Sequence, residues 1–224
     1  MQLNRKNFFN QLTSLVDSNS KILLGFSGGS DSTALLILLS KVLAKENLHA
    51  IHINHNLNDY SLKFERFSRK FCSDNNVSLT VIEESRNIIT SESDEMWGRR
   101  IRYKHFQSLV NDLGFDFIAT AHHANDNFET VLMNLDNGCS INGIRGIPER
   151  NKNVIRPLLR FKKKDILKYM HQKSINYVDD PSNEDISIKR NFIRKNIMTK
   201  IEALDDKYID KLSLISMEAT LAVN

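Results

Sequence analysis

The stretch that most constrains the fold runs from Leu23 to Ser32 and has the sequence LLGFSGGSDS. A short apolar run, typical of a buried strand, breaks into a loop of serines and glycines and continues into an apolar helical run over 33–39. Two glycines let a backbone approach a ligand closely, and the first turn of a helix offers N–H groups to an anion. The stretch therefore predicts a strand, a phosphate-binding loop and a helix in succession.

This loop lacks the Gly-Lys-Ser/Thr ending with which the Walker loop grips the β- and γ-phosphates. A carboxylate beside phosphates is repulsive unless a cation lies between them, so we expect Asp31 to bind Mg²⁺. An ordinary glycine turn with a Ser or Asp helix cap is the alternative. The loop residues predicted to hold phosphate groups are Ser27, Gly28, Gly29, Ser30, Asp31 and Ser32.

Segments whose hydrophobic residues are spaced as in strands alternate along the chain with segments whose hydrophobic residues are spaced as in helices. Strands are expected at 21–26, 48–54, 77–83 and 115–121, and helices at about 8–16, 33–45, 64–71, 106–113 and from 126 onward. The alternation predicts an α/β fold with a doubly wound, Rossmann-like parallel sheet. Ligands bind at the carboxyl ends of the strands in such sheets, so the segments after Phe26, Ile53 and Ala121 should lie at one site.

The composition fits a single α/β domain with its own core. Of 224 residues, 41% are hydrophobic and 26% are charged, as is ordinary for a globular protein. The longest apolar run is too short to span a bilayer, and the first residues lack a signal-peptide pattern. Cys72 and Cys139 suggest neither a disulfide framework nor a Cys-x-x-Cys site. We therefore expect a cytoplasmic protein with no membrane partner.

Positive charge is concentrated in one part of the chain. The net charge is +4, but residues 145–200 carry fifteen Lys and Arg against six Asp and Glu, so the remainder is acidic. Such a concentration is typical of a surface that binds a polyanion, and also of a solvated helix face with surplus lysines. Composition alone leaves both interpretations open.

A second group of polar residues, over 120–130, follows the strand expected at 115–121. Asp126 and Glu129 are three residues apart, so on a helix they share a face and could hold a metal, take a proton or recognise an ammonium group. His122 and His123 suggest zinc, but no third ligand stands at a recognisable spacing. Helix capping by Asn125 or Asp126 is the alternative.

Two further segments carry arginines. Arg99 and Arg102 would project from one helix and could meet a phosphate or a carboxylate, although Glu95 and Arg99 also match a simple i,i+4 ion pair. A basic run at 189–194 follows an acidic turn at 179–185, a pattern that helix capping by acidic residues would also give.

Together these segments resemble the tRNA(Ile)-lysidine synthase family, a branch of the N-type ATP pyrophosphatases (PP-loop superfamily), in order over residues 22–197. The residues that depart from those the family often carries are Asn54, Asn56, Asn58, Asn125 and Asn127, which leaves the roles of positions 54 and 125 open. The matching residues are 27–32, 52–57, 120–130 and 156–159, with Glu95, Arg99, Arg102, Tyr103, Asp180, Asn183, Arg190, Asn191 and Arg194.

The resemblance implies an adenine nucleotide alpha hydrolase-like fold and a ligase that forms a carbon–nitrogen bond while converting ATP to AMP and pyrophosphate. The substrates it implies are tRNA(Ile) with a CAU anticodon, free lysine and ATP with Mg²⁺. O2 of the wobble cytidine would attack the α-phosphate, and lysine would then displace AMP from the activated cytidine.

The resemblance also implies roles for residues of this sequence. Asp126 is the expected base for the lysine ammonium, which Glu129 would hold, and Asp31 the expected metal ligand. The other residues carried over are Arg99 in catalysis, His52 and His122 at ATP, and Arg102, Arg190, Asn191 and Arg194 at the RNA.

Residues 1–200 are expected to form the catalytic domain, and 201–224 a helical segment that could link to a C-terminal domain, because family members commonly extend further. The assembly, monomer or homodimer, is open. A tRNA thiolase or another PP-loop enzyme is the nearest alternative, but Cys72 and Cys139 are not placed by pattern for thiolation. A nucleotide-binding module without catalysis would leave the acids at the strand ends unexplained.

Overall fold

The computed structural model describes residues 2–56, 60–86, 92–179, 185, 188–205 and 207–223. Asp180 and Asn183, which carry part of the resemblance, lie outside these described residues. The strands are β1 (Ile22–Gly25), β2 (Leu48–Asn54), β3 (Ser78–Glu83), β4 (Phe117–Ala119), β5 (Arg150–Asn151) and β6 (Val154–Ile155). The helices are α1 (Arg5–Thr13), α2 (Ser30–Ser40), α3 (Ser61–Asp74), α4 (Asp94–Leu113), α5 (Ala124–Asp136), α6 (Ile141–Ile144), α7 (Lys163–Gln172), α8 (Lys189–Phe192), α9 (Thr199–Leu204) and α10 (Tyr208–Val223), with a 3-10 turn η1 (Lys45–Asn47) and a π-helical stretch η3 (Ile193–Met198).

These strands form one sheet in the order β3-β2-β1-β4-β6-β5, parallel except for the antiparallel pair β5 and β6. Leu24 in β1 lies opposite Ala50 of β2 on one side and Ala119 of β4 on the other. The strand order reverses between β1 and β4, and ligands bind in the crevice at such a reversal. The predicted doubly wound sheet is confirmed.

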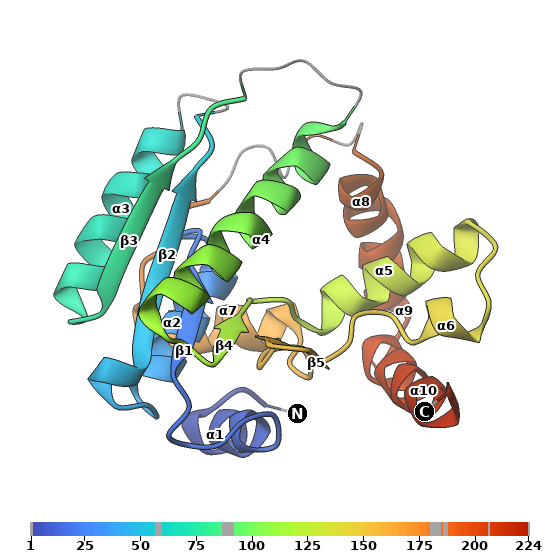
Figure 1. Ribbon diagram of the computed structural model, residues 1–224. Coiled ribbons are helices and arrows are strands. Elements are labelled where there is room, and N and C mark those ends of the chain that lie inside the picture. The colour runs from blue at the N-terminus through green and yellow to red at the C-terminus, as the bar shows by residue number, and fades with distance from the viewer. Residues whose placement is uncertain are drawn as a thin grey trace.

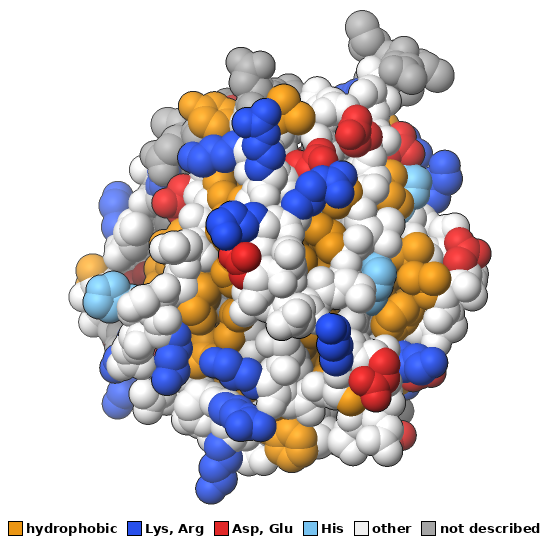
Figure 2. All heavy atoms as spheres, turned by 90° about the vertical axis from the view of Figure 1, so that its left-hand side faces the viewer, with side chains coloured by type: hydrophobic (Ala, Val, Ile, Leu, Met, Phe, Trp, Pro, Cys, Tyr) orange, Lys and Arg blue, Asp and Glu red, His pale blue; other side chains and the backbone are white. Residues whose placement is uncertain are grey.

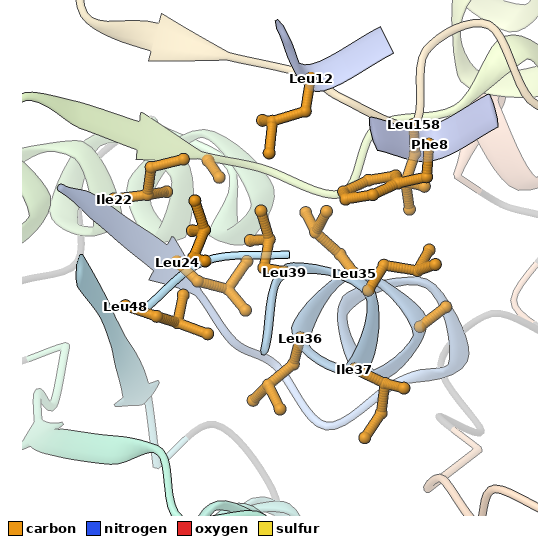
Figure 3. Packing of buried hydrophobic residues seen from close by; sticks show 14 of the residues in the cluster. Phe8, Leu12, Ile22, Leu24, Leu35, Leu36, Ile37, Leu39, Leu48 and Leu158 are labelled. Atoms are coloured by element: carbon orange, nitrogen blue, oxygen red, sulfur yellow. The ribbon is translucent and has the colours of Figure 1, made fainter. Parts of the chain in front are cut away.

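Both faces of β1 are buried, because successive side chains of a strand point to opposite sides. Ile22 and Leu24 pack into a cluster with Leu35 of α2, and Leu23 packs on the other face with Phe106 of α4. Figure 3 shows part of the first cluster, in which Phe8 and Leu12 of α1 lie beside Leu35 and Leu39 of α2. Helices on both sides of a parallel sheet explain why β1 is a continuous apolar run.

Several element boundaries differ from the sequence expectation for local reasons. Gly114, with φ +66°, ends α4 as predicted, and its N–H bonds to the Val110 carbonyl. Helix α5 begins at Ala124, two residues early, because His123 caps it. The hairpin of β5 and β6 was not predicted, since two-residue strands show no periodicity, and neither was the four-residue helix α6.

The C-terminal helices cover α5. Figure 1 shows α8, α9 and α10 beside α5 and α6. Phe128 of α5 shares a buried cluster with Ile193 and Ile209, and the Ser216 hydroxyl in α10 donates to the Ile144 carbonyl at 2.9 Å. This packing brings the segment after residue 188 against the polar start of α5.

The surface around α3 carries mixed charge. On that face, which Figure 2 turns toward the viewer, Lys and Arg side chains are spread among acidic and apolar ones. None of the helices described combines the length and the apolar composition that crossing a bilayer requires.

Candidate active site

The loop between β1 and α2 has the backbone of a phosphate cradle. Gly28 has φ +86°, a conformation that favours glycine, and a Cβ there would lie 3.2 Å from Phe67. Gly29 is the N-cap of α2, and among the described residues no side chain caps this helix. The first N–H groups of α2 are thus available to an anion, as the sequence predicts.

Ser32 shapes this loop from inside. Its Oγ accepts hydrogen bonds from the backbone N–H groups of Ser27 (3.3 Å) and Gly28 (3.2 Å), and it donates to the Gly29 carbonyl (3.1 Å). The hydroxyl of Ser27 lies 3.0 Å from the same atom. These bonds fix the curve of the loop, while direct contact of the two hydroxyls with pyrophosphate stays a prediction.

The two histidines predicted at the nucleotide lie on either side of β1, His52 in β2 and His122 just after β4. His52 is buried, and its Nδ1 lies 2.9 Å from the Phe26 carbonyl oxygen, where it fastens the start of the loop. His122 follows β4, and its Nδ1 lies 2.9 Å from Thr120 Oγ1. Burial, with a further contribution from Arg156, lowers the pKa of His122 to about 4, so this ring is neutral at pH 7.

Lys163, which sequence analysis did not single out, reaches the loop from α7. Its Nζ donates to both carboxylate oxygens of Asp31, at 2.7 and 2.8 Å, and to Ser30 Oγ at 2.7 Å. The predicted cation site at Asp31 therefore holds an ammonium group of the chain itself. A sequence signal exists, because three consecutive lysines, 162–164, closely follow the segment 156–159 that carries the resemblance.

His123 joins the loop to the start of α5. Its Nε2 lies 3.7 Å from Asp31 Oδ2, and its Nδ1 lies 3.4 Å from Asp126 Oδ2. The Asp126 carboxylate accepts the His123 backbone N–H at 2.8 Å, while the His123 ring accepts the Asp126 N–H at 3.4 Å. This reciprocal pair is a capping box, so the capping alternative holds for Asp126 as a local role.

Glu129 lies one turn further along α5, and its side chain is fully buried. Arg190 Nε donates to its Oε2 at 2.7 Å, and Arg194 donates to Oε1 at 2.8 Å and to Oε2 at 3.0 Å. Arg190 also reaches Asp126 Oδ1 at 3.2 Å. The structure thus brings the two predicted acids together with two arginines to which the resemblance gives a role at the RNA.

Burial and charge act in opposite directions in this cluster. Burial raises the pKa of Asp126, but its interactions with His123 and Arg190 outweigh burial, and the pKa is lowered overall. Burial likewise opposes the charged forms of Arg190 and Arg194, yet the carboxylates raise the pKa of both. Asp126 is consequently ionised at neutral pH.

Arg99 and Tyr103, both on α4, line a cavity of about 330 Å³ with Arg156 and the hairpin residues 151–154. The Arg99 guanidinium lies over the Tyr103 ring at 5.2 Å. Among the described residues, neither the Tyr103 hydroxyl nor Arg156 Nε has a hydrogen-bond partner, although both are buried. The cavity therefore presents positive charge and unused polar atoms.

The remaining predicted RNA contacts lie apart from this cavity. Arg102 is exposed, and its Nε donates to the Gly98 carbonyl within its own helix at 3.3 Å. Asn191 is buried, and its amide donates to the Asp185 carbonyl at 2.9 Å. Their roles toward RNA stay predictions.

Magnesium fits this site as a partner of phosphate. Within the parts of the chain that the structure describes, no group of three or more His, Cys, Asp and Glu side chains could hold a metal ion. A zinc site, which needs three or four protein ligands, does not fit the described side chains. Mg²⁺ is commonly bound by one or two carboxylates and substrate phosphates, and Asp31 beside the loop offers that chemistry.

The PP-loop domain family matches residues 1–201 of the chain. The tRNA(Ile)-lysidine synthase of Chlorobaculum tepidum is 38% identical over 194 residues, which cover 84% of this chain and 59% of that relative. The enzyme of the same name from Caldanaerobacter subterraneus is 34% identical over 194 residues, or 84% of this chain and 42% of the relative. The chain thus spans about half the length of these relatives.

Solved structures share the fold. The U34-tRNA thiolase NcsA from Methanococcus maripaludis, with its 4Fe-4S cluster, superposes with a TM-score of 0.79 at 19% identity and covers 96% of this chain and 76% of its own. The NH3-dependent NAD synthetase from Campylobacter jejuni gives a TM-score of 0.54 at 15% identity, over 99% and 97% of the two chains. At these identities the likeness concerns the arrangement of sheet and helices alone.

Proposed function

The chain belongs to the PP-loop family, and from that membership we propose that it joins lysine to a cytidine of tRNA(Ile) at the expense of ATP. O2 of the cytidine attacks the α-phosphorus of ATP, and pyrophosphate leaves. The ε-amine of lysine then forms a bond to C2 as the C2–O2 bond breaks, and AMP leaves with the oxygen. The similarity to named tRNA(Ile)-lysidine synthases over 84% of the chain supports this choice of substrates.

One observation carries the proposal, namely that the nucleotide loop and the acid cluster form one site. His123 lies between Asp31 of the loop and Asp126 of α5, 3.7 Å from one carboxylate and 3.4 Å from the other. Both elements stand at the carboxyl ends of β1 and β4, where the strand order reverses. A phosphate-activation step and an amine attack can therefore share one crevice.

Asp126 is our candidate base. A lysine side chain arrives as an ammonium with an unperturbed pKa of about 10.4 and must lose a proton before it attacks. An ionised carboxylate can attract that ammonium and accept the proton. Glu129 supports the site by holding Arg190 and Arg194 beside Asp126, and a direct contact of Glu129 with the lysine ammonium would require these arginines to give way.

The loop and the cavity supply the other roles. The backbone of 27–30 would hold the pyrophosphate part of ATP, and Asp31 would hold Mg²⁺, which neutralises the leaving pyrophosphate. His52 would act on ATP indirectly, through its bond to the Phe26 carbonyl. Arg99 and Arg156 give the 330 Å³ cavity a charge suited to an RNA phosphate, and Arg102 and Asn191 would contact the RNA outside this cavity. A tRNA substrate implies that the enzyme acts in the cytoplasm.

The thiolase alternative finds no support in the cysteines. Cys72 lies in the core on α3, 1% exposed, and burial raises the pKa of its thiol to about 12. Cys139, in the segment after α5, is a free cysteine. Clusters of the 4Fe-4S type are held by several Cys thiolates, and this chain has two cysteines in all.

Release of AMP and pyrophosphate, measured with and without lysine and with tRNA(Ile) bearing a CAU anticodon, tests the proposal. Turnover should need both substrates and fall by about 10²–10⁴-fold in Asp126→Asn, the range of a lost general base. Asp112→Asn, an exposed aspartate on α4, is the matched control and should leave turnover unchanged. Release of AMP that ignores lysine, or that depends on a sulfur donor, would assign the chain to a different acceptor.

A further inference from the structure

Helix α10 is apolar on two opposite sides, of which the described chain covers only one. Its side toward α5 and α6 is buried, at residues Ile209, Ser216 and Ala219. On its other side Leu214 is 60% exposed and Leu221 is 77% exposed. Figure 1 shows this helix at the edge of the molecule, below α5 and α6. Because a helix with apolar residues all round is typically buried all round, the outer side is a candidate interaction surface.

The outer surface of α10 is defined by six exposed side chains. Positions 211, 214, 218 and 221 among them follow a 3-4-3 spacing, which places them along one line of a helix. That spacing is typical of a helix that packs lengthwise against a second helix. The six residues are Tyr208, Lys211, Leu214, Ile215, Glu218 and Leu221.

The inner side of α10 holds the helix in place. The Ser216 hydroxyl donates to the Ile144 carbonyl of α6 at 2.9 Å, and it accepts the Asn127 amide of α5 at 3.4 Å. Asp210, near the start of α10, forms an ion pair with Lys162. The outer surface therefore belongs to a helix whose own position is fixed before any partner binds.

The charges of the outer surface are complementary to themselves. Lys211 and Glu218 stand seven residues apart, which is about two turns of a helix. When two copies of α10 run antiparallel about a two-fold axis between residues 214 and 215, Lys211 of each copy lies opposite Glu218 of the other. In a parallel pair, each charge would instead lie level with the same charge of the other copy. The charges thus favour one direction and one register.

The same antiparallel arrangement covers the exposed apolar side chains. Leu214 and Ile215 lie beside the axis, so each meets the corresponding residues of the second copy. Leu221, two turns further along, lies against the start of the other α10. A two-fold arrangement uses one surface on both copies, which is the commonest form of homodimer.

Lys211 and Glu218 are both available for such pairs. Glu218 is exposed, and it forms no ion pair with the residues that the structure describes. Lys211 Nζ lies 2.7 Å from Asp205 Oδ2, but the lysine side chain is 57% exposed. An ammonium group has three donors, so Lys211 can hold Asp205 and a second carboxylate together.

We infer that the outer surface of α10 binds a second copy of this chain, as an antiparallel helix pair with two-fold symmetry. Two Lys211–Glu218 pairs fix its direction, and the exposed leucines cover one another. One helix from each copy makes a small interface, so the dimer should have a dissociation constant of about 1–100 µM. The inference requires neither ATP nor tRNA, and it is therefore tested separately from the proposed function.

Sedimentation equilibrium of the full chain over this concentration range measures the dimer. Leu214→Asp should weaken it by at least about 100-fold, because it places two unpaired carboxylates beside the axis. Leu62→Asp makes the same change at a position of α3 that is 55% exposed, and it should leave the dissociation constant unchanged. Circular dichroism of each variant shows that the fold is retained.

Charge reversal tests the register without removing a leucine. Glu218→Lys and Lys211→Glu should each weaken the dimer by about 10- to 100-fold, because two attractive contacts become two repulsive ones. The double variant that carries both changes should regain the affinity of the unaltered chain. A mixture of the two single variants should form a heterodimer, although each alone is largely monomeric. An apolar surface that associates without a fixed register would show neither effect.

Disulfide formation reports the direction of the pair, in a Cys139→Ser background. Ile215→Cys lies beside the axis and should cross-link two copies on oxidation. Leu221→Cys should not, because the two copies of this position lie about 20 Å apart along an antiparallel pair, too far for a disulfide. Cross-linking at position 221 in preference to 215 would contradict the antiparallel arrangement.

Three other results would overturn the inference. One is a monomer at every concentration up to about 100 µM, and another is a dimer that Leu214→Asp leaves unchanged. The third is a double charge-reversal variant that dimerises no better than the single variants. A monomer that binds some other molecule through Leu214 would assign the surface to a different occupant and would equally contradict the inference.

Discussion

Glu129 is the residue whose replacement tests the acid cluster most directly. Its carboxylate is fully buried and accepts three hydrogen bonds from Arg190 and Arg194. Glu129→Gln keeps the size of the side chain but removes its charge, and it turns an amide N–H₂ toward donors. Two guanidinium groups then lose their main counter-charge.

The size of the expected loss in the free energy of unfolding follows from the burial of the three side chains. Removing one partner of a buried ion pair costs about 3–5 kcal/mol. The side chains of Arg190 and Arg194 are 25% and 40% exposed, so water compensates part of that loss. We expect Glu129→Gln to lower the free energy of unfolding by about 2–3 kcal/mol, allowing for this screening. In a chain of this size that is a fall of about 4–12 °C in Tm.

Urea and thermal unfolding measure this effect, with Glu149→Gln as the control. Glu149 pairs with Arg160 at the surface, where such a pair contributes less than about 1 kcal/mol. The double variant Glu129→Gln with Arg194→Gln should recover part of the loss, because it also removes one of the stranded charges. A Glu129→Gln protein as stable as the control would refute the claim that this carboxylate holds α8 and η3 against α5.

Three further outcomes are expected. Gly28→Ala should lower the free energy of unfolding by about 1–3 kcal/mol because of the positive φ at this position, and it should also weaken ATP binding. Gly138→Ala, at a position with φ +73° and no atoms near the added Cβ, should lower the free energy of unfolding by the same backbone strain and leave ATP binding unchanged. Because the pKa of His122 is lowered to about 4, only the unfolded chain binds a proton at this ring between about pH 4 and 6.5, and the free energy of unfolding rises with pH over that range. His122→Gln should therefore reduce the slope of the free energy of unfolding against pH, by at most about 1.4 kcal/mol per pH unit. His171→Gln, at an exposed position, is the control and should leave that slope unchanged. The pKa of Asp126 is lowered in the folded protein, so its ionised carboxylate stabilises the fold fully above about pH 4, and this stabilisation is lost as the pH falls through the folded pKa. The free energy of unfolding measured at low pH should therefore fall less steeply with decreasing pH in Asp126→Asn than in Asp112→Asn.

The fold could be predicted from the sequence because its main elements carry a clear period. The strand at Ile22–Gly25 is apolar throughout since both of its faces are buried, and Gly114 stops α4 at a left-handed residue. The hairpin of β5 and β6 has no such signal. Its strands are two residues long, and their pairing with β4 comes from tertiary contact.

The sequence predicted that Asp126 and Glu129 lie close together, but it did not predict which side chains they contact. Spacing on α5 shows that Asp126 and Glu129 share a face, yet it does not show that Glu129 is buried or that Arg190, more than sixty residues later, contacts both acids. Lys163 was missed for the same reason, because its contact with Asp31 spans 132 residues. Contacts of that range depend on packing, which local pattern does not encode.

The positive charge of residues 145–200 is in large part neutralised within the molecule. At least six of its fifteen cations form ion pairs, and all but one of the acids involved lie outside the segment. The excess that the sequence suggests for RNA binding is therefore partly the counterpart of acids elsewhere in the chain. The pairs are Arg160 with Glu149, Lys162 with Asp210, Lys163 with Asp31, Lys189 with Asp136, and Arg190 and Arg194 with Asp126 and Glu129.

This internal pairing sets a limit on how strongly tRNA binding can depend on salt. Each phosphate neutralised adds about 0.7–0.9 to the slope of log K against log salt. All fifteen cations of the segment with Arg99 and Arg102 would give a slope near −15, whereas the nine at most that remain in the segment, with the same two arginines, would give one no steeper than about −10. Fluorescence anisotropy with labelled tRNA(Ile) between 50 and 200 mM KCl, roughly the range over which such slopes are resolved, measures it. A slope steeper than about −10 would mean that internal pairs open on binding, as they would if Arg190 and Arg194 left Glu129 for the RNA.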